Sequence, residues 1–382
     1  MFIEKLTGRA ACALAVSAFA LSLGLTAANE AKAADFSGKR IRVIVPFNEG
    51  GGTDSLTRFL QPYMEKYLPG KPKILVINKP GAGGIVGGNY FEARAKKDGT
   101  WVMALSTSTI MNYILGDPRV KFNVRGWRPI VLLPRGTMIY ARKELGLGGL
   151  PAKEKIEKLR SFPKEALVHG GKTPTSSIIN KLMSYSLLGV DVKMVFGMKG
   201  NGPMALAFER GEFTLNFDNS LSYMNNRKHF RETKIANEIW TFGAPNANGE
   251  WKDANGKWFR DPTWPKVPTY YEVYEEWAGK KFDGPQAMAT LALIRVGVAA
   301  NKSFHLPNGS DSGALKSWRD AVRTTFKDKS FIKKKAKVLG GYPVAVGEPA
   351  KKALHQAISL NAGERKWIKD YFKKQFDLNL KI

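Results

Sequence analysis

The sequence is poor in the residues that usually hold metals or act as nucleophiles. It contains one cysteine, Cys12, in a chain of 382 residues, so an internal disulfide is excluded. No two histidines have the short spacing of a zinc-binding motif. The histidines are His169, His229, His305 and His355. A metal centre built from cysteine and histidine is therefore not predicted.

Motifs of catalysis and of nucleotide binding are also lacking. There is no G-x-S-x-G nucleophile elbow, and the complete phosphate-binding motif G-x-x-x-x-G-K-S/T does not occur. Residues 81–88 begin like the dinucleotide motif G-x-G-x-x-G, but Val86 stands where the third glycine is required. These absences favour a binding protein over an enzyme, and no cofactor is expected. A catalytic triad stays an alternative, because its members are adjacent only in space.

Acidic residues are scarce relative to basic ones. The chain has 33 Asp and Glu against 60 Lys and Arg, a formal net charge of +27. Such a balance is common among nucleic-acid-binding proteins, but the basic residues are dispersed and do not alternate with stacking aromatic residues. Nucleic acid is therefore not an expected partner. The charge either belongs to a solvated surface or attracts anionic solutes or an anionic membrane surface.

The amino-terminal segment has the pattern of an export signal. Lys5 and Arg9 precede an uncharged stretch rich in alanine and leucine, and "AKA" at 31–33 matches a small-x-small cleavage site. We expect a signal peptide over residues 1–33, with cleavage near Ala33 and a periplasmic location. A membrane anchor is the alternative, which the shortness of the stretch and its small residues disfavour.

Alternating strand and helix patterns predict two α/β lobes with largely parallel sheets. The first lobe shows apolar strands before glycine turns and helices, at 40–47, 73–80 and 100–107. A second series of strand, polar turn and helix begins near residue 137. We assign lobe 1 to residues 34–136 and 241–382 and lobe 2 to residues 137–240. The segment 238–245 is predicted to return the chain to lobe 1.

Residues 246–265 depart from this pattern and are predicted to be an insertion. Asn255-Gly256 stands between short runs that carry tryptophan, which predicts a hairpin turn. Trp251, Trp258 and Trp264 cluster in this segment. They form either an aromatic brace packed on the surface or a lid over a ligand or partner.

Five motifs occur in an order and spacing that resemble one receptor family. They are "VIVPF" followed by "GGGTD" (43–54), "NKPGAGG" (78–84), "DGTWVMALSTS" (98–108), "MKGNGPMALAFERGEFTLNFDN" (198–219) and "PKVPTYYE" (265–272). Together they resemble the periplasmic solute-binding receptors of tripartite tricarboxylate transporters, the Bug-type receptors. The resemblance covers roughly residues 36–376, apart from the tryptophan-rich insertion.

The resemblance implies a type II-like periplasmic binding protein. In such a protein two α/β lobes, joined by crossing strands, close on a ligand between them. It also implies a monomeric receptor without enzymatic activity or cofactor, which captures a small carboxylate-containing solute and delivers it to integral-membrane permease subunits. A receptor that signals to a membrane sensor kinase is an alternative, and a periplasmic enzyme is another.

The resemblance further implies which residues contact the ligand. On the first lobe they are Phe47, Asn48, Gly51, Gly52, Thr53, Asp54, Ala82, Gly83, Gly84, Ser106, Thr107 and Ser108. On the second lobe they are Thr173, Thr175, Ser176, Lys199, Asn201 and Asp218. Each loop follows a predicted strand, at the end where α/β sheets bind ligands. Structural roles stay open as well: Thr53 or Asp54 as a helix cap, and residues 81–84 as a tight corner.

The glycine turns at 50–52 and 81–84 have a physical reason to bind an anion. With few side chains in the way, their N–H groups can face a carboxylate directly or through water. Each exposed helix N-terminus adds about 0.3–1 kcal/mol of favourable potential. Glu49 departs from the family pattern, because it places a negative charge beside this cradle. Either its side chain points outward, or the ligand is not a simple anion.

Overall fold

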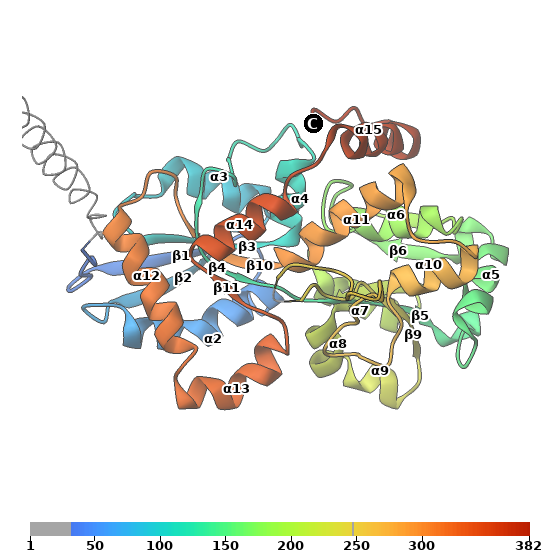
Figure 1. Ribbon diagram of the computed structural model, residues 1–382, viewed down its shortest axis with the longest axis horizontal. Coiled ribbons are helices and arrows are strands. Elements are labelled where there is room, and N and C mark those ends of the chain that lie inside the picture. The colour runs from blue at the N-terminus through green and yellow to red at the C-terminus, as the bar shows by residue number, and fades with distance from the viewer. Residues whose placement is uncertain (1–31, 247) are drawn as a thin grey trace, which may run out of the picture.

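The computed structural model describes residues 32–246 and 248–382. The predicted signal peptide lies almost wholly in residues 1–31, outside the described residues. Two β-sheets, each covered by helices, form two lobes that stand side by side (Figure 1). The α/β fold class predicted from the sequence is confirmed. Among the described residues, no helix combines the length and the apolar character that a membrane crossing requires.

The first lobe contains a six-stranded sheet. Its order is β11 (Ala345–Val346), β4 (Arg128–Leu133), β10 (Lys302–Leu306), β3 (Trp101–Ser106), β1 (Arg40–Val45) and β2 (Lys73–Asn78). The strands expected at 40–47, 73–80 and 100–107 are confirmed as the parallel trio β1, β2 and β3, whereas β10 runs antiparallel to β3 and β4. The helical elements of this part of the chain are α2 (Gly52–Tyr67), η1 (Ala82–Gly84), α3 (Ile85–Arg94), α4 (Thr107–Ile114), α12 (Ser312–Thr325), α13 (Lys329–Leu339) and α14 (Glu348–Ala357).

The second lobe contains a five-stranded sheet. Its order is β7 (Lys193–Val195), β6 (Val168–Gly170), β8 (Leu215–Asn219), β5 (Thr137–Arg142) and β9 (Ala236–Thr241). The remaining helical elements are η2 (Lys143–Leu145), α5 (Ala152–Ser161), η3 (Lys164–Ala166), α6 (Ile179–Leu187), α7 (Asn201–Glu209), α8 (Ser220–Asn226), α9 (Lys228–Glu232), α10 (Tyr270–Ala278), α11 (Gly284–Ala299) and α15 (Ala362–Phe376). Strand β6 pairs in parallel with β7 and β8, whereas β5 is antiparallel to both of its neighbours.

Helix α2 illustrates how apolar spacing builds a lobe. Leu56, Leu60, Tyr63 and Met64 recur at helical spacing, and all four are buried against the first sheet. Each such side chain contributes roughly 1.5–3 kcal/mol when it is removed from water. This burial anchors the helix whose first residues form one wall of the site described below.

The chain passes between the two sheets twice. The first passage runs from β4 to β5 through residues 134–136, and the second lies between β9 and β10. Within the second interval α10 packs against α5 and β9, on the side of the second lobe. Helix α15 packs on α11 (Figure 1). The Phe376 ring lies 5.8 Å from that of Phe196. The predicted lobe boundaries stay a prediction, and these contacts favour extending lobe 2 beyond residue 241.

The tryptophan-rich insertion is packed against the body of the protein. An antiparallel bridge between Lys252 and Trp258 closes the predicted hairpin turn. The Trp258 ring is buried and stacks on Tyr271 with ring centroids 4.1 Å apart. The Trp264 indole donates a hydrogen bond to the backbone oxygen of Ser220 at 3.1 Å. These contacts support the brace interpretation over the lid.

Candidate functional site

A cleft of about 540 Å³ lies between the loops of the two sheets. Its walls come from the loops after β1, β3, β6, β7 and β8, and from the passage between β4 and β5. These loops leave the carboxyl ends of their strands, where ligands bind in open α/β sheets. The volume falls within the range of small-molecule sites, about 300–1,000 Å³. The cleft is therefore the candidate functional site.

The structure brings many of the predicted ligand contacts together in this cleft. Those that line it are Phe47, Asn48, Gly51, Gly52, Thr53, Ser106, Thr107, Ser108, Lys199, Asn201 and Asp218. The other seven do not line it. They are Asp54, Ala82, Gly83, Gly84, Thr173, Thr175 and Ser176. Contact with a ligand stays a prediction for the first group, and the structure gives the second group other partners.

Asp54 holds the first glycine turn in shape from beneath. Its carboxylate accepts hydrogen bonds from the Gly50 N–H, the Arg58 Nε and the Asn78 amide, each at 3.0 Å from one of its oxygens. Burial raises the pKa of this carboxyl, but the bonds from Arg58, Asn78 and Gly50 outweigh burial and lower it below its usual value. Gly51, not Thr53 or Asp54, is the N-cap of α2. Asp54 therefore positions the cradle and does not form its surface.

Glu49 points away from the cleft interior. Its side chain is 79% exposed, and one carboxylate oxygen lies 3.8 Å from an Arg58 nitrogen at the rim. A pair this exposed contributes little free energy. The first of the two alternatives raised by the sequence therefore holds, and Glu49 does not oppose an anion deeper in the cleft.

Several predicted site residues instead join the two lobes to each other. We name this group the interlobe seam. It consists of Ala82, Gly83, Asn112, Asp117, Thr173 and Thr175. The Asn112 amide donates to the backbone oxygens of Ala82 and Gly83 at 3.3 and 3.2 Å. From the second lobe, the Thr175 hydroxyl lies 2.9 Å from Asn112 Oδ1 and 2.7 Å from Asp117 Oδ2.

The remaining two of the seven residues shape turns. Ser176 donates its hydroxyl hydrogen to the Thr173 backbone oxygen at 2.7 Å. Gly84 has a φ of +100°, and a Cβ there would come 2.2 Å from the Thr109 hydroxyl. Only glycine fits this corner, because both the backbone angle and the space exclude a side chain. The tight-corner interpretation of the second glycine turn is thus supported.

Four of the six basic side chains that line the cleft and that sequence reasoning did not single out form one group. We name them the cation cluster: Arg135, Lys172, Lys181 and Lys302. Arg135 lies in the passage between β4 and β5, and Lys302 begins β10. Lys172 follows β6, and Lys181 is on α6. The exposed fractions of Arg135, Lys181 and Lys302 are 6%, 2% and 7%, whereas Lys172 is partly buried.

The cluster has few hydrogen-bond partners of its own. Lys172 donates to the Asn201 side-chain oxygen at 3.0 Å, and Lys181 to the Ser177 backbone oxygen at 2.9 Å. The Lys181 ammonium also lies 3.9 Å from the centre of the Phe217 ring. Among the described residues, the side chains of Arg135 and Lys302 have no hydrogen-bond or ion-pair partner. Two of the four cations therefore present free donors to the cleft.

Burial disfavours the charged forms of these groups in the empty cleft. It lowers the pKa of Lys172 to about 8 and that of Arg135 to about 10. Burial, together with the charge of neighbouring cluster members, lowers the pKa of Lys181 and of Lys302 well below the usual range. An anion placed among them would reverse these shifts, because an opposite charge favours the protonated forms.

Asp218 is the acid nearest to this cluster, and it is already engaged. Its Oδ2 lies 3.1 Å from the Arg227 Nε and accepts the Tyr140 hydroxyl at 2.9 Å. Burial raises the pKa of Asp218, against the opposing effect of Arg227. The pair is part of the cleft wall. The charge of Asp218 raises the pKa of Lys172 against the effect of burial, but Asp218 forms no ion pair with any of the four cations.

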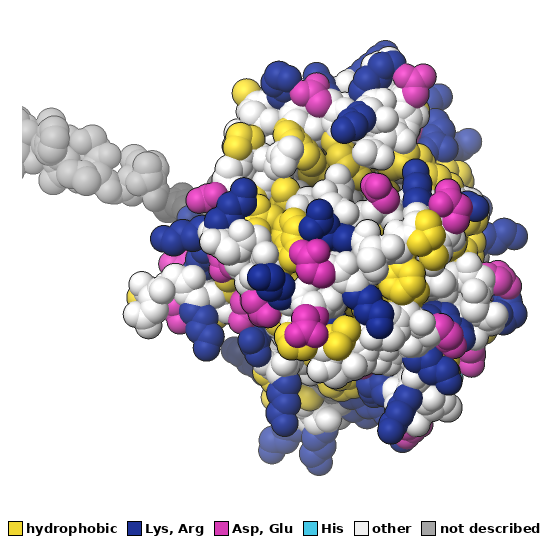
Figure 2. All heavy atoms as spheres, turned by 90° about the vertical axis from the view of Figure 1, so that its right-hand side faces the viewer, with side chains coloured by type: hydrophobic (Ala, Val, Ile, Leu, Met, Phe, Trp, Pro, Cys, Tyr) yellow, Lys and Arg dark blue, Asp and Glu magenta, His cyan; other side chains and the backbone are white. Residues whose placement is uncertain are grey.

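The outer surface carries its charge differently from the cleft. Figure 2 shows basic side chains scattered over the end face of the second lobe, between acidic and apolar ones. No single basic patch dominates that face. The solvated-surface interpretation of the net charge fits there, and the buried cations of the cleft are a separate feature.

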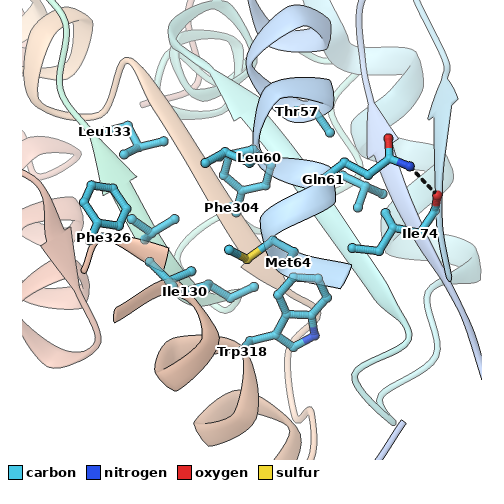
Figure 3. Close-up of a pocket in the computed structure, with 13 residues that line it drawn as sticks. Thr57, Leu60, Gln61, Met64, Ile74, Ile130, Leu133, Phe304, Trp318 and Phe326 are labelled. Carbon is cyan, nitrogen blue, oxygen red and sulfur yellow. Dashed lines mark hydrogen bonds between the residues drawn. The ribbon is translucent and has the colours of Figure 1, made fainter. Parts of the chain in front are cut away.

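A second cavity lies inside the first lobe, between α2, the sheet and α12 (Figure 3). It measures about 30 Å³, and its wall is almost wholly apolar. Gln61 reaches from α2 to the Ile74 backbone oxygen at 2.9 Å beside it (Figure 3). Such a volume holds about one water molecule. It is too small for a solute. In the described part of the chain, no group of three His, Cys, Asp or Glu side chains is arranged to hold a metal ion.

Comparison with curated proteins gives one partial match. No protein-family model matches the chain. A UPF0065 protein from the tcbD-tcbE intergenic region of a Pseudomonas species is 31% identical over 120 residues. The match spans 31% of this chain and 34% of that relative, about a third of its length. The similarity between this relative and the present chain is shown over those 120 residues.

Solved structures share the fold over most of the chain. The periplasmic binding protein BugD has a TM-score of 0.62 at 19% identity, covering 89% of this chain and 98% of its own. MatC from Rhodopseudomonas palustris, solved with malate, has a TM-score of 0.61 at 21% identity and covers 87% of this chain and 98% of its own. An R. palustris protein solved with adipate has a TM-score of 0.64 at 18% identity and covers 89% of this chain and 98% of its own. The chain therefore has the two-lobed fold of periplasmic binding proteins, and its predicted resemblance to the Bug-type receptors is confirmed.

Proposed function

We propose that the chain is a periplasmic solute-binding receptor. It captures a small carboxylate-containing solute between its lobes and delivers it to the permease subunits of a tripartite tricarboxylate-type transporter. The observation that carries the proposal is the cleft, where loops of both sheets surround basic side chains without matching carboxylates. The export signal in the sequence supports the periplasmic location, and the lack of catalytic motifs supports a receptor without enzymatic activity.

Three helix N-termini support the choice of an anion. Helices α2, α4 and α7 begin at Gly52, Thr107 and Asn201, and all three residues line the cleft. The first N–H groups of a helix have no intrahelical acceptor, and the helix dipole adds positive potential there. A carboxylate at the termini of α2 and α7 gains hydrogen bonds from backbone groups that are already oriented, whereas the Thr107 N–H of α4 already donates to the Asn301 backbone oxygen at 3.1 Å. The first glycine turn contributes by leaving this approach free of side chains.

The related folds support the class of solute. MatC was solved with malate and the other R. palustris protein with adipate, and both ligands carry carboxylates. Transfer of this class to the present chain is part of the proposal. Hinge closure of the two lobes around the solute would then present the closed form to the permease. We expect the receptor to act as a monomer.

The proposal is tested by calorimetry against a panel of di- and tricarboxylates, aromatic acids and amino acids. We expect at least one acid to bind and to raise the thermal stability, by about 2.7 kcal/mol at one hundred times its Kd. Failure of every acid in the panel to bind the folded protein would contradict the proposal.

A blocking variant shows whether binding occurs in the cleft. A Cβ at Gly52 meets no atom within 4 Å, so Gly52→Leu has room to fold and narrows the cleft. We expect it to lose binding while its Tm stays near that of the unchanged protein. The matched control is Ala152→Leu, at the first position of α5 and outside the cleft lining. Equal binding by both variants would move the site elsewhere.

A further inference from the structure

The cleft contains more positive charge than its structure uses. Seven basic and two acidic residues line it. Both acids already have partners: Glu49 lies beside Arg58 at the rim, and Asp218 is paired with Arg227. Neither forms an ion pair with a member of the cation cluster. Within the described residues, the cluster therefore has no carboxylate of its own, although the charge of Asp218 favours the protonated form of Lys172.

An unbalanced cluster of this kind is unfavourable for the empty protein. A buried charge without a partner loses its hydration and gains nothing in return. Arg135 and Lys302 pack no counter-ion against their charged groups, although each is more than nine-tenths buried. Lys302 is further disfavoured by the charges of Arg135 and Lys172. An anion that enters the cleft recovers this free energy and favours the protonated forms of the cluster.

The cluster is divided between the two lobes. Lys302 belongs to β10 of the first sheet. In the second lobe, Lys172 follows β6, and Lys181 on α6 lies over the Phe217 ring of β8. Arg135 stands in the segment that connects the sheets. Like charges from opposite sides repel one another as the lobes approach. An anion with a single charge leaves most of this repulsion in place.

We propose that the solute of this cleft carries at least two negative charges, which the cation cluster binds by direct ion pairs from both lobes. This inference rests on the proposed receptor function and narrows its ligand. Arg135 presents a planar fork suited to one carboxylate or phosphoryl group. The ammonium groups of Lys302, Lys172 and Lys181 then form ion pairs with the second negative charge of the ligand. Side-chain cations thus add to the backbone N–H groups and select ligands by charge number.

The same arrangement disfavours amino acids and other zwitterions. Their ammonium group would enter a cleft already rich in cations, and Asp218, the one acid near the cluster, is occupied by Arg227 and Tyr140. Neutral and singly charged ligands would leave buried cations unpaired. The predicted discrimination is therefore strongest between ligands of equal shape and different charge.

Matched ligand pairs test the inference directly. Calorimetry at one salt concentration compares adipate with its monoamide and succinate with succinamate, which differ by one charge and little in shape. Inorganic phosphate, which has no carboxylate, is added to separate carboxylate from phosphoryl recognition. We expect each diacid that binds to be preferred over its monoamide by roughly 30-fold or more, the usual loss for an unpaired buried charge. Equal affinity within a pair would overturn the inference.

Variants locate the effect in the cluster. Lys302→Gln should weaken a diacid by roughly 30-fold and its monoamide much less. Lys172→Gln, at a partly buried position, provides a second variant with less influence on packing. The control is Lys334→Gln, which removes the same charge from an exposed site on α13 outside the cleft lining. Equal weakening of diacid and monoamide by Lys302→Gln would overturn the inference.

Thermal unfolding without ligand gives an independent measurement. If Lys302 is an unpaired buried cation, Lys302→Gln should leave the Tm of the empty protein unchanged or higher, and should lower only the ligand-induced increase. A large loss of Tm in the empty protein would assign Lys302 a structural role and contradict the inference.

Tight binding of a monoacid by the unchanged protein would refute the charge-number inference and leave the receptor function standing. Binding of inorganic phosphate, with no binding of any diacid, would support two charges and refute the carboxylate.

Discussion

The interlobe seam and the cation cluster are both polar groups where the two lobes meet, but they differ in their partners. In the seam, Thr175 bonds Asn112 and Asp117, and Asp117 also accepts two hydrogen bonds from the Arg119 guanidinium at 2.7 and 2.9 Å. In the cluster, Arg135 and Lys302 have no such partners among the described residues. The seam is complete without a ligand, whereas the cluster is not.

This difference separates polar residues that hold the protein together from those that await a solute. A satisfied network stabilises the arrangement in which it forms, because removing one member leaves the others unpaired. An unsatisfied set of buried charges destabilises the empty state and gains when an anion arrives. Seam variants should therefore change stability more than affinity, and cluster variants the reverse. The following predictions test that contrast.

Asp117→Ala should have the largest effect on stability. The side chain is 5% exposed, and its loss leaves the Thr175 hydroxyl and the Arg119 guanidinium without their main acceptor. We expect the free energy of unfolding to fall by about 3 kcal/mol, measured by urea denaturation. Asp370→Ala, whose carboxylate is exposed, serves as the control. A change below about 0.5 kcal/mol would show that the seam contributes no stability.

Thr175→Val should have a smaller effect of the same kind. The substitution keeps the shape and removes the hydroxyl that reaches Asn112 and Asp117. Loss of one buried hydrogen bond predicts a decrease of about 1 kcal/mol in unfolding free energy, with the affinity for a diacid nearly unchanged. A tenfold loss of affinity in a protein of unchanged stability would instead place Thr175 in contact with the ligand, as the family resemblance first implied.

The pH dependence of affinity should show the smallest effect and report on the cluster alone. Lys172 has a pKa of about 8 in the empty cleft, where Asp218 favours its charge and burial disfavours it. The charge of Lys172 in turn helps to lower the pKa of its neighbours Lys181 and Lys302. A bound anion raises the pKa of Lys172, so the complex holds more protons than the free protein.

The sign of this linkage fixes the direction of the change. The contribution of Lys172 to affinity is complete below about pH 8 and declines above it, by at most about tenfold for each pH unit. Calorimetry in two buffers of different ionisation enthalpy should detect proton uptake near pH 8. The Lys172→Gln variant should lose this component. An affinity that rises between pH 8 and 9 would contradict the assignment.

The parallel strands of the first lobe could be predicted because short apolar runs end at glycine turns there. The strand β10 and the helix α11 could not be predicted in the same way. Strand β10 is five residues long and buries Ser303 and His305 among its apolar residues, and α11 is apolar on nearly all sides, so neither shows a clear alternation. Tertiary burial, not local pattern, decides both elements.

The candidate site was predicted in part for a similar reason. Loops that follow predicted strands could be placed at one end of each sheet, and eleven of the eighteen predicted residues line the cleft. The cations were missed because a lysine in a sequence carries no sign of burial. Arg135 had the clearest signal, since "PRG" interrupts two apolar runs at the passage between the lobes. Residues 82–84 and 173–176 follow strands too, but face each other across the seam.

The central claim is that the cleft binds a carboxylate-bearing solute through its cation cluster. A crystal structure of the protein as purified, or with adipate, tests this most directly. The account predicts a solute between the lobes, with one anionic group within hydrogen-bond distance of Arg135 and another near Lys302. A solute bound in the cleft with a neutral or positively charged group against those two side chains would contradict it.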